Sequence, residues 1–93
     1  IQGEGGVRPI SAELAAAIER VCARTGTLLI ADEIQCGLGR TGHAFYYQAL
    51  GLTPDLVTVG KAIGGGVPVG AALVSEDVAR QVLPGDHGTT YGG

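Results

Sequence analysis

The stretch Asp55-Leu-Val-Thr-Val-Gly-Lys-Ala-Ile-Gly-Gly-Gly66 indicates how this chain folds. Its apolar, β-branched run from Leu56 to Val59 is typical of a buried strand, and the glycines that follow indicate a tight turn. Lys61 lies between this strand and the glycines 64–66. A lysine at the carboxyl end of a buried strand is expected to be partly desolvated, which favours the uncharged amine that forms Schiff bases. Taken alone, Lys61 is interpreted more plainly as a surface lysine that closes a strand.

A second strand is predicted upstream, over the continuous apolar run from Thr27 to Ala31, and Asp32 follows it directly. An amphipathic helix is predicted before that strand, because Ser11 is a suitable N-cap and Gly26 a suitable stop. Strands and helices in this order indicate an α/β fold whose sheet is mostly parallel, with flanking helices. Ligands bind outside the carboxyl ends of such strands, which is where we expect both Asp32 and Lys61.

The rest of the chain adds shorter elements to this pattern. One side of the upstream helix is an apolar stripe, which places Cys22 in the expected core. A short helix is predicted over residues 44–50. The run Ala71 to Val74 follows the lysine strand too closely for a crossover helix, so we expect it to leave the parallel pattern. Ser75 is expected to cap a last helix, and residues 1–6 to be the end of a strand followed by a turn.

Composition narrows the classes of function. The 93 residues include 17 glycines and 45% hydrophobic residues, which suits buried strands and tight turns rather than disorder. A net charge of −3 without a basic cluster argues against nucleic acid, and no apolar run is long enough to span a membrane. Two cysteines are too few for a disulfide framework, so we expect a cytoplasmic protein. Because the chain lacks methionine, we expect 1–93 to be a fragment truncated at both ends.

Three familiar motifs fail on spacing or context. Asp55 stands where a phosphate-binding P-loop needs its first glycine. The glycines of 37–42 match a dinucleotide fingerprint, but residues 32–36 separate them from the strand that should precede them directly. His43 and His87 do not have metal-ligand spacing with each other or with the cysteines. We therefore predict no metal site.

The combination that remains is Asp-Glu-x-Gln at 32–35 together with Lys61. A carboxylate and an amine at neighbouring strand ends could form a structural ion pair. They are also the groups that pyridoxal 5′-phosphate requires. The lysine forms an imine with the cofactor aldehyde, and the aspartate pairs with the pyridine nitrogen and keeps it protonated. The residues alone leave both interpretations open.

Three segments, in matching order and spacing, resemble the class-III pyridoxal-phosphate-dependent aminotransferases over essentially all 93 residues. These are Leu29-Ile-Ala-Asp-Glu-Ile-Gln-Cys-Gly-Leu-Gly-Arg-Thr-Gly42, Pro54-Asp55 through Gly66, and His87-Gly-Thr-Thr-Tyr-Gly-Gly93. The resemblance implies part of the large domain of a fold-type I enzyme, which acts as a homodimer with shared active sites. It also implies amino transfer from N2-acetylornithine to 2-oxoglutarate, in arginine biosynthesis.

Several alternatives stay open beside that expectation. A sibling enzyme could act on ornithine or 4-aminobutyrate instead, and an aminomutase or a decarboxylase would share the cofactor but not the product. A non-enzymatic α/β module would use Asp32 and Lys61 as a structural pair. The kinds of product formed, and the presence of an imine absorbance, separate these alternatives.

The resemblance implies roles for residues that match the family's motifs. Lys61 matches the catalytic lysine that carries the cofactor. Asp32 matches the partner of the pyridine nitrogen, and Gln35 matches a residue near the ring oxygen of the cofactor. All three are therefore expected to bind pyridoxal 5′-phosphate.

Three further positions extend the implied site. Thr90 matches a threonine that binds the cofactor phosphate of the neighbouring subunit, and Thr89 matches a position near the substrate. Glu4 matches a gate carboxylate that helps to distinguish the two ends of a diamino substrate; on the residues alone it would be a solvated loop carboxylate. The phosphate-binding turn, the stacking aromatic residue and the substrate arginine of the family are expected elsewhere in a complete chain.

Overall fold

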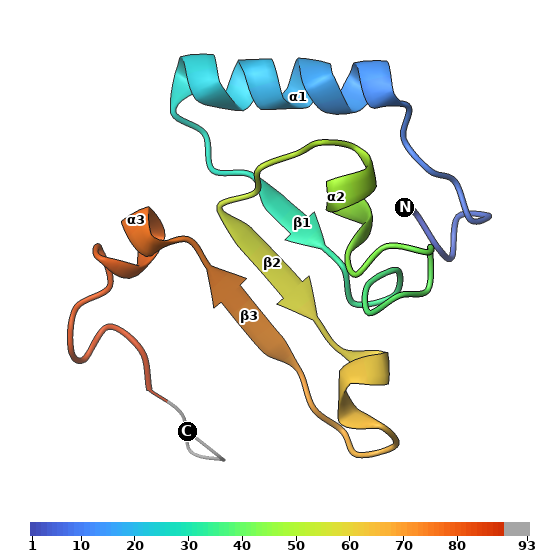
Figure 1. The fold of residues 1–93 in the computed structure, drawn as a ribbon. Helices are drawn as coiled ribbons and strands as arrows, with labels where there is room; N and C mark the ends of the chain where they lie inside the picture. Colours follow the sequence, from blue (N-terminus) through green and yellow to red (C-terminus); the bar gives the residue numbers. More distant parts are fainter. Residues whose placement is uncertain (89–93) are drawn as a thin grey trace.

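The computed structural model describes residues 1–88, and its centre is a sheet of three short strands. These are β1 (Ile30–Asp32), β2 (Leu56–Val59) and β3 (Ala71–Val74), which lie in that order (Figure 1). The first two strands are parallel, whereas β3 is antiparallel to β2. The predicted α/β class is confirmed, as is the departure of β3 from the parallel pattern.

Helical segments lie at the edges and ends of this sheet (Figure 1). They are α1 (Ala12–Thr25), α2 (Tyr46–Ala49), the 3₁₀ turn η1 (Lys61–Gly64) and α3 (Glu76–Ala79). The predicted start and stop of α1 are confirmed. The Ser11 hydroxyl accepts a hydrogen bond from the Leu14 backbone N–H at 3.2 Å, and Gly26 ends the helix in the left-handed conformation with φ 69°.

The core of the described region is small and lies on one face of the sheet. Side chains alternate along β2, so that Val57 and Val59 are buried while their neighbours are half-buried. Cys36 is also buried, whereas Cys22 is only half-buried and Leu14 is 50% exposed. The expectation that Cys22 lies in the core was therefore wrong, because the apolar stripe of α1 is only partly covered: Leu14 and Val21 are about half exposed.

Three element boundaries differ from the sequence-based expectation. Strand β1 begins at Ile30 rather than Thr27, because the Leu29 backbone N–H donates to the Asp55 carboxylate at 2.7 Å instead of joining the sheet. Helix α2 is one turn long, shorter than the predicted 44–50. Residues 1–6 form a turn closed by an isolated bridge between Gln2 and Arg8, rather than the end of a longer strand.

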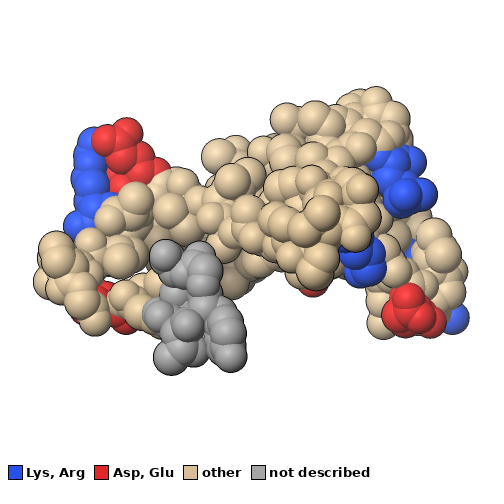
Figure 2. Space-filling view, turned by 90° about the horizontal axis from the view of Figure 1, so that it is seen from below, with Lys and Arg blue, Asp and Glu red and all other residues tan. Residues whose placement is uncertain are grey.

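Charged side chains are spread over the surface in small groups. On the face shown in Figure 2, acidic and basic side chains lie next to each other at one end of the molecule, and most of the surface is uncharged. At the end of α3, Arg80 forms an ion pair with Glu76 at 2.7 Å. None of the helices within residues 1–88 has both the length and the apolar character needed to cross a membrane.

Candidate active site

The two residues on which the functional prediction depends lie at the same edge of the sheet. Asp32 is the last residue of β1 and pairs in register with Thr58 of β2. Because the two strands are parallel, their carboxyl ends coincide, and Lys61 follows Thr58 by three residues. Lys61 is exposed, however, so the expected partial desolvation is not observed. The chain leaves the sheet after the buried Gly60, and no described element covers the turn that carries the lysine.

Lys61 adopts a backbone conformation that is rare for residues with a side chain. Its φ is +47°, in the left-handed region that normally suits glycine. Among the described residues only Val7 and Leu38 share this property, with φ of 53° and 57°. Val7 and Lys61 line the same cavity, and Leu38 lies in the loop that forms its wall. Strained backbone of this kind concentrates at functional sites.

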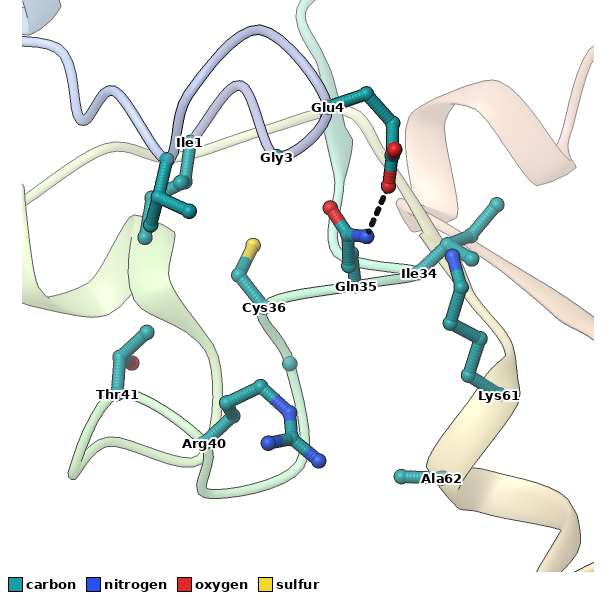
Figure 3. Close-up of a pocket in the computed structure, with 12 residues that line it drawn as sticks. Ile1, Gly3, Glu4, Ile34, Gln35, Cys36, Arg40, Thr41, Lys61 and Ala62 are labelled. Carbon is teal, nitrogen blue, oxygen red and sulfur yellow. Dashed lines mark hydrogen bonds between the residues drawn. The ribbon is translucent and has the colours of Figure 1, made fainter.

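That cavity has a volume of about 610 Å³ and lies between the first turn of the chain, the loop after β1 and η1. Its polar lining residues are Glu4, Gln35, Arg40, Thr41 and Lys61. Figure 3 shows Lys61 and Arg40 entering it from different segments, η1 and the 36–42 loop. Cavities of this size accommodate small-molecule ligands.

Gln35 and Glu4 meet across the cavity although they are far apart in sequence. The Gln35 side-chain amide donates a hydrogen bond to the Glu4 carboxylate at 3.1 Å (Figure 3). Gly3 permits this approach, because a Cβ added there would overlap the Gln35 side chain. The structure thus brings together three of the predicted site residues, Glu4, Gln35 and Lys61.

Asp32 lies beside this cavity rather than in its lining. Its Oδ1 accepts hydrogen bonds from the Ile34 backbone N–H and the Thr58 hydroxyl. Within residues 1–88 the ion pairs all involve Arg80, so Asp32 and Lys61 are not paired with each other there. The interpretation of these two residues as a structural ion pair is therefore not supported. Thr89 and Thr90, the other predicted site residues, lie outside the described residues.

Sequence reasoning missed Glu33, which is only 4% exposed. Its Oε1 accepts the Tyr47 backbone N–H at 2.8 Å, and its Oε2 accepts the Cys36 thiol at 3.1 Å. The carboxylate therefore joins the loop after β1 to the start of α2. Strand alternation could have indicated this, because it turns Glu33 to the face opposite Asp32.

Gly37 and Cys36 continue this buried cluster. A Cβ at Gly37 would lie 2.7 Å from the Glu33 carbonyl oxygen, so the loop passes too closely for any other residue. Burial, and after it the neighbouring Glu33 carboxylate, together raise the pKa of the Cys36 thiol to about 11. Cys36 is therefore a protonated, hydrogen-bonded thiol at neutral pH.

The hydrogen-bonding groups at this edge of the sheet fit pyridoxal 5′-phosphate. They comprise an exposed amine on Lys61, an amide on Gln35, and a carboxylate on Asp32 whose Oδ2 has no hydrogen-bond donor among residues 1–88. These are the functional groups that hold the aldehyde, the ring oxygen and the ring nitrogen of that cofactor.

Comparison with known proteins identifies the class. The family model for class-III aminotransferases matches residues 1–93, and the chain belongs to this family. Acetylornithine aminotransferase from Rhodobacter capsulatus is 52% identical over the whole chain, which corresponds to 24% of that protein. The chain thus spans about a quarter of the length of such relatives.

Solved structures agree with this assignment. Ornithine aminotransferase from Plasmodium yoelii superimposes with a TM-score of 0.87 and 39% identity, over 98% of this chain and 24% of that one. N-acetylornithine aminotransferase from Stenotrophomonas maltophilia gives 0.82 and 45%, over 86% and 22%. Both are aminotransferases, so the predicted α/β fold of part of such an enzyme is confirmed.

Proposed function

We propose that the complete protein is a pyridoxal-phosphate-dependent aminotransferase, and that this chain is a central part of its large domain. The observation that carries the proposal is Lys61, whose exposed amine is presented into a ligand-sized cavity by a strained backbone. Membership of the class-III family supports the same reaction class. When bound, pyridoxal phosphate supplies an electron sink for the carbanion that forms at the substrate carbon.

Each predicted site residue has a defined task in this proposal. Lys61 binds the cofactor and afterwards moves a proton with its freed amine, as a general base and acid. Asp32 holds the proton at the ring nitrogen, and Gln35 donates to the ring oxygen. Glu4, which already accepts from Gln35, selects the end of the substrate that enters. Thr90 and Thr89 are proposed to bind phosphate and substrate.

The proposed amino donor is N2-acetylornithine and the proposed acceptor is 2-oxoglutarate. The acetylornithine aminotransferases, which share about half of their aligned residues with this chain, support this choice. Ornithine is the second candidate donor, because the Plasmodium structures that superimpose well are named ornithine aminotransferases. Homodimeric assembly, a place in arginine biosynthesis and a cytoplasmic location stay predictions.

A donor screen of the complete protein tests the proposal. N2-acetylornithine, ornithine and 4-aminobutyrate are each supplied with 2-oxoglutarate, and glutamate formation is measured. We expect the highest kcat/KM with N2-acetylornithine. A higher value with ornithine would transfer the assignment to the second candidate. Release of CO₂ without glutamate would refute an aminotransferase altogether.

A further inference from the structure

The Asp32 carboxylate is held in an asymmetric way. Its Oδ1 accepts two hydrogen bonds, from the Ile34 backbone N–H at 3.1 Å and from the Thr58 hydroxyl at 3.3 Å. Its Oδ2 accepts none from any residue in 1–88. One oxygen is therefore anchored to the protein, and the other is available to a ligand.

The strand register places the Thr58 side chain next to that of Asp32. The two residues are direct partners across β1 and β2. Side chains of paired residues lie on the same face of a sheet, here the face opposite the buried Val57 and Val59. The terminal torsion of an aspartate is broad, so an unanchored carboxylate at an exposed strand end would rotate. Two donors on one oxygen fix the plane of the carboxylate.

We propose that Thr58 is a positioning residue for the cofactor: its hydroxyl, together with the Ile34 N–H, holds Oδ1 of Asp32 so that Oδ2 is presented to the pyridine nitrogen. This inference rests on the proposed function. It adds a residue that the lysine and aspartate motifs do not include, since Thr58 lies in the middle of the apolar strand. A hydroxyl in that run serves the carboxylate rather than the core.

The test compares Thr58→Val with Thr58→Ser in the complete protein. Valine keeps the shape and the preference for strands but removes the hydroxyl, whereas serine keeps the donor. The first readout is the ¹⁵N NMR shift of the ring nitrogen in labelled pyridoxal phosphate, which reports protonation of that nitrogen. The second is the dissociation constant of the cofactor, measured by equilibrium dialysis of the apoprotein.

We expect Thr58→Val to move the ring ¹⁵N signal towards the unprotonated value and to weaken cofactor binding by up to roughly 10- to 150-fold, the range for a lost hydrogen bond to a charged group. Thr58→Ser should restore both. Thr53→Val is the matched control, because it makes the same chemical change at an exposed position before β2 and should alter neither readout.

Two outcomes would overturn the inference. An unchanged ¹⁵N signal and dissociation constant in folded Thr58→Val would show that the hydroxyl does not position Asp32. If the valine variant fails to fold, a serine variant that lacks the wild-type ¹⁵N signal would show the same. Asp32→Asn separates this from the proposed function: a wild-type ¹⁵N signal in that variant would refute the role of Asp32 itself.

Discussion

At the scale of single residues, Lys61 joins a reactive amine to an unfavourable backbone conformation. It is the only lysine among the 93 residues. Lys61→Ala in the complete protein should abolish the visible absorbance of the bound cofactor and reduce turnover by roughly 10³-fold or more, because both the covalent link and the proton carrier are lost. Absorbance spectra and steady-state rates measure this.

Arg80→Ala is the control for that substitution. Arg80 is exposed at the end of α3, and within residues 1–88 it forms ion pairs only with Glu76 and Asp77 of that helix, so its removal should leave both the spectrum and the rate unchanged. Undiminished turnover by Lys61→Ala would contradict the assigned role of the lysine.

Cys36 gives a second prediction at this scale, and it concerns pH. Its pKa is raised from 9.0 to about 11 by burial and by Glu33. Alkylation by iodoacetamide in the folded protein should therefore remain slow at pH 9 and accelerate only as the pH approaches 11. Because the folded-state pKa lies above the unfolded value, stability from this group is complete below about pH 9.0 and falls as the pH rises towards 11.

Glu33→Gln tests the cause of that shift. Loss of the carboxylate charge should lower the pKa of Cys36 and speed its alkylation at pH 9, as followed by mass spectrometry of the modified peptide. An alkylation rate at Cys36 that is the same in both proteins would show that Glu33 does not influence the thiol.

At the scale of elements, the sequence predicted the helix and strand boundaries that depend on residues close to one another in the chain. The bounds of β2 and β3 and both ends of α1 agree with the structure, because β-branched runs, an N-cap serine and a C-terminal glycine act within a few residues. The buried state of Glu33 and the start of β1 depend instead on partners at Tyr47 and Asp55. Such contacts across the fold are not visible in a local pattern.

The candidate site divides in the same way. The strand ends indicated Asp32 and Lys61, and the family resemblance added Glu4 and Gln35, which proved to be in contact. Neither the left-handed conformation of Lys61 nor the Thr58 contact to Asp32 could be anticipated, because both follow from how the turn leaves the sheet and how the strands pair.

The loop after β1 supplies the prediction at this scale. Gly37→Ala should destabilise the complete protein by about 1–3 kcal/mol, because the new Cβ would press on the Glu33 backbone. Thermal and urea unfolding measure the change. Gly70→Ala is the matched control, since a Cβ there meets only an ordinary contact at 3.5 Å. Equal stability of the two variants would show that the loop relaxes without cost.

At the scale of the whole molecule, the described residues contain too small a core to be stable alone. Their buried apolar side chains are Ala15, Cys36, Val57 and Val59, while Ile30 on the sheet is 58% exposed. The 93-residue chain expressed by itself should therefore show no sharp heat-absorption peak in calorimetry and no binding of pyridoxal phosphate. A cooperative transition together with cofactor binding would contradict this prediction.

The left-handed backbone at Lys61 has a consequence for laboratory evolution. A non-glycine residue in that region carries roughly 1–3 kcal/mol of strain, which a glycine would relieve. Libraries screened for heat resistance alone should therefore enrich glycine at position 61. The selected variants would then lack the amine that the proposed reaction needs. Only a screen that couples survival at high temperature to turnover would retain the lysine.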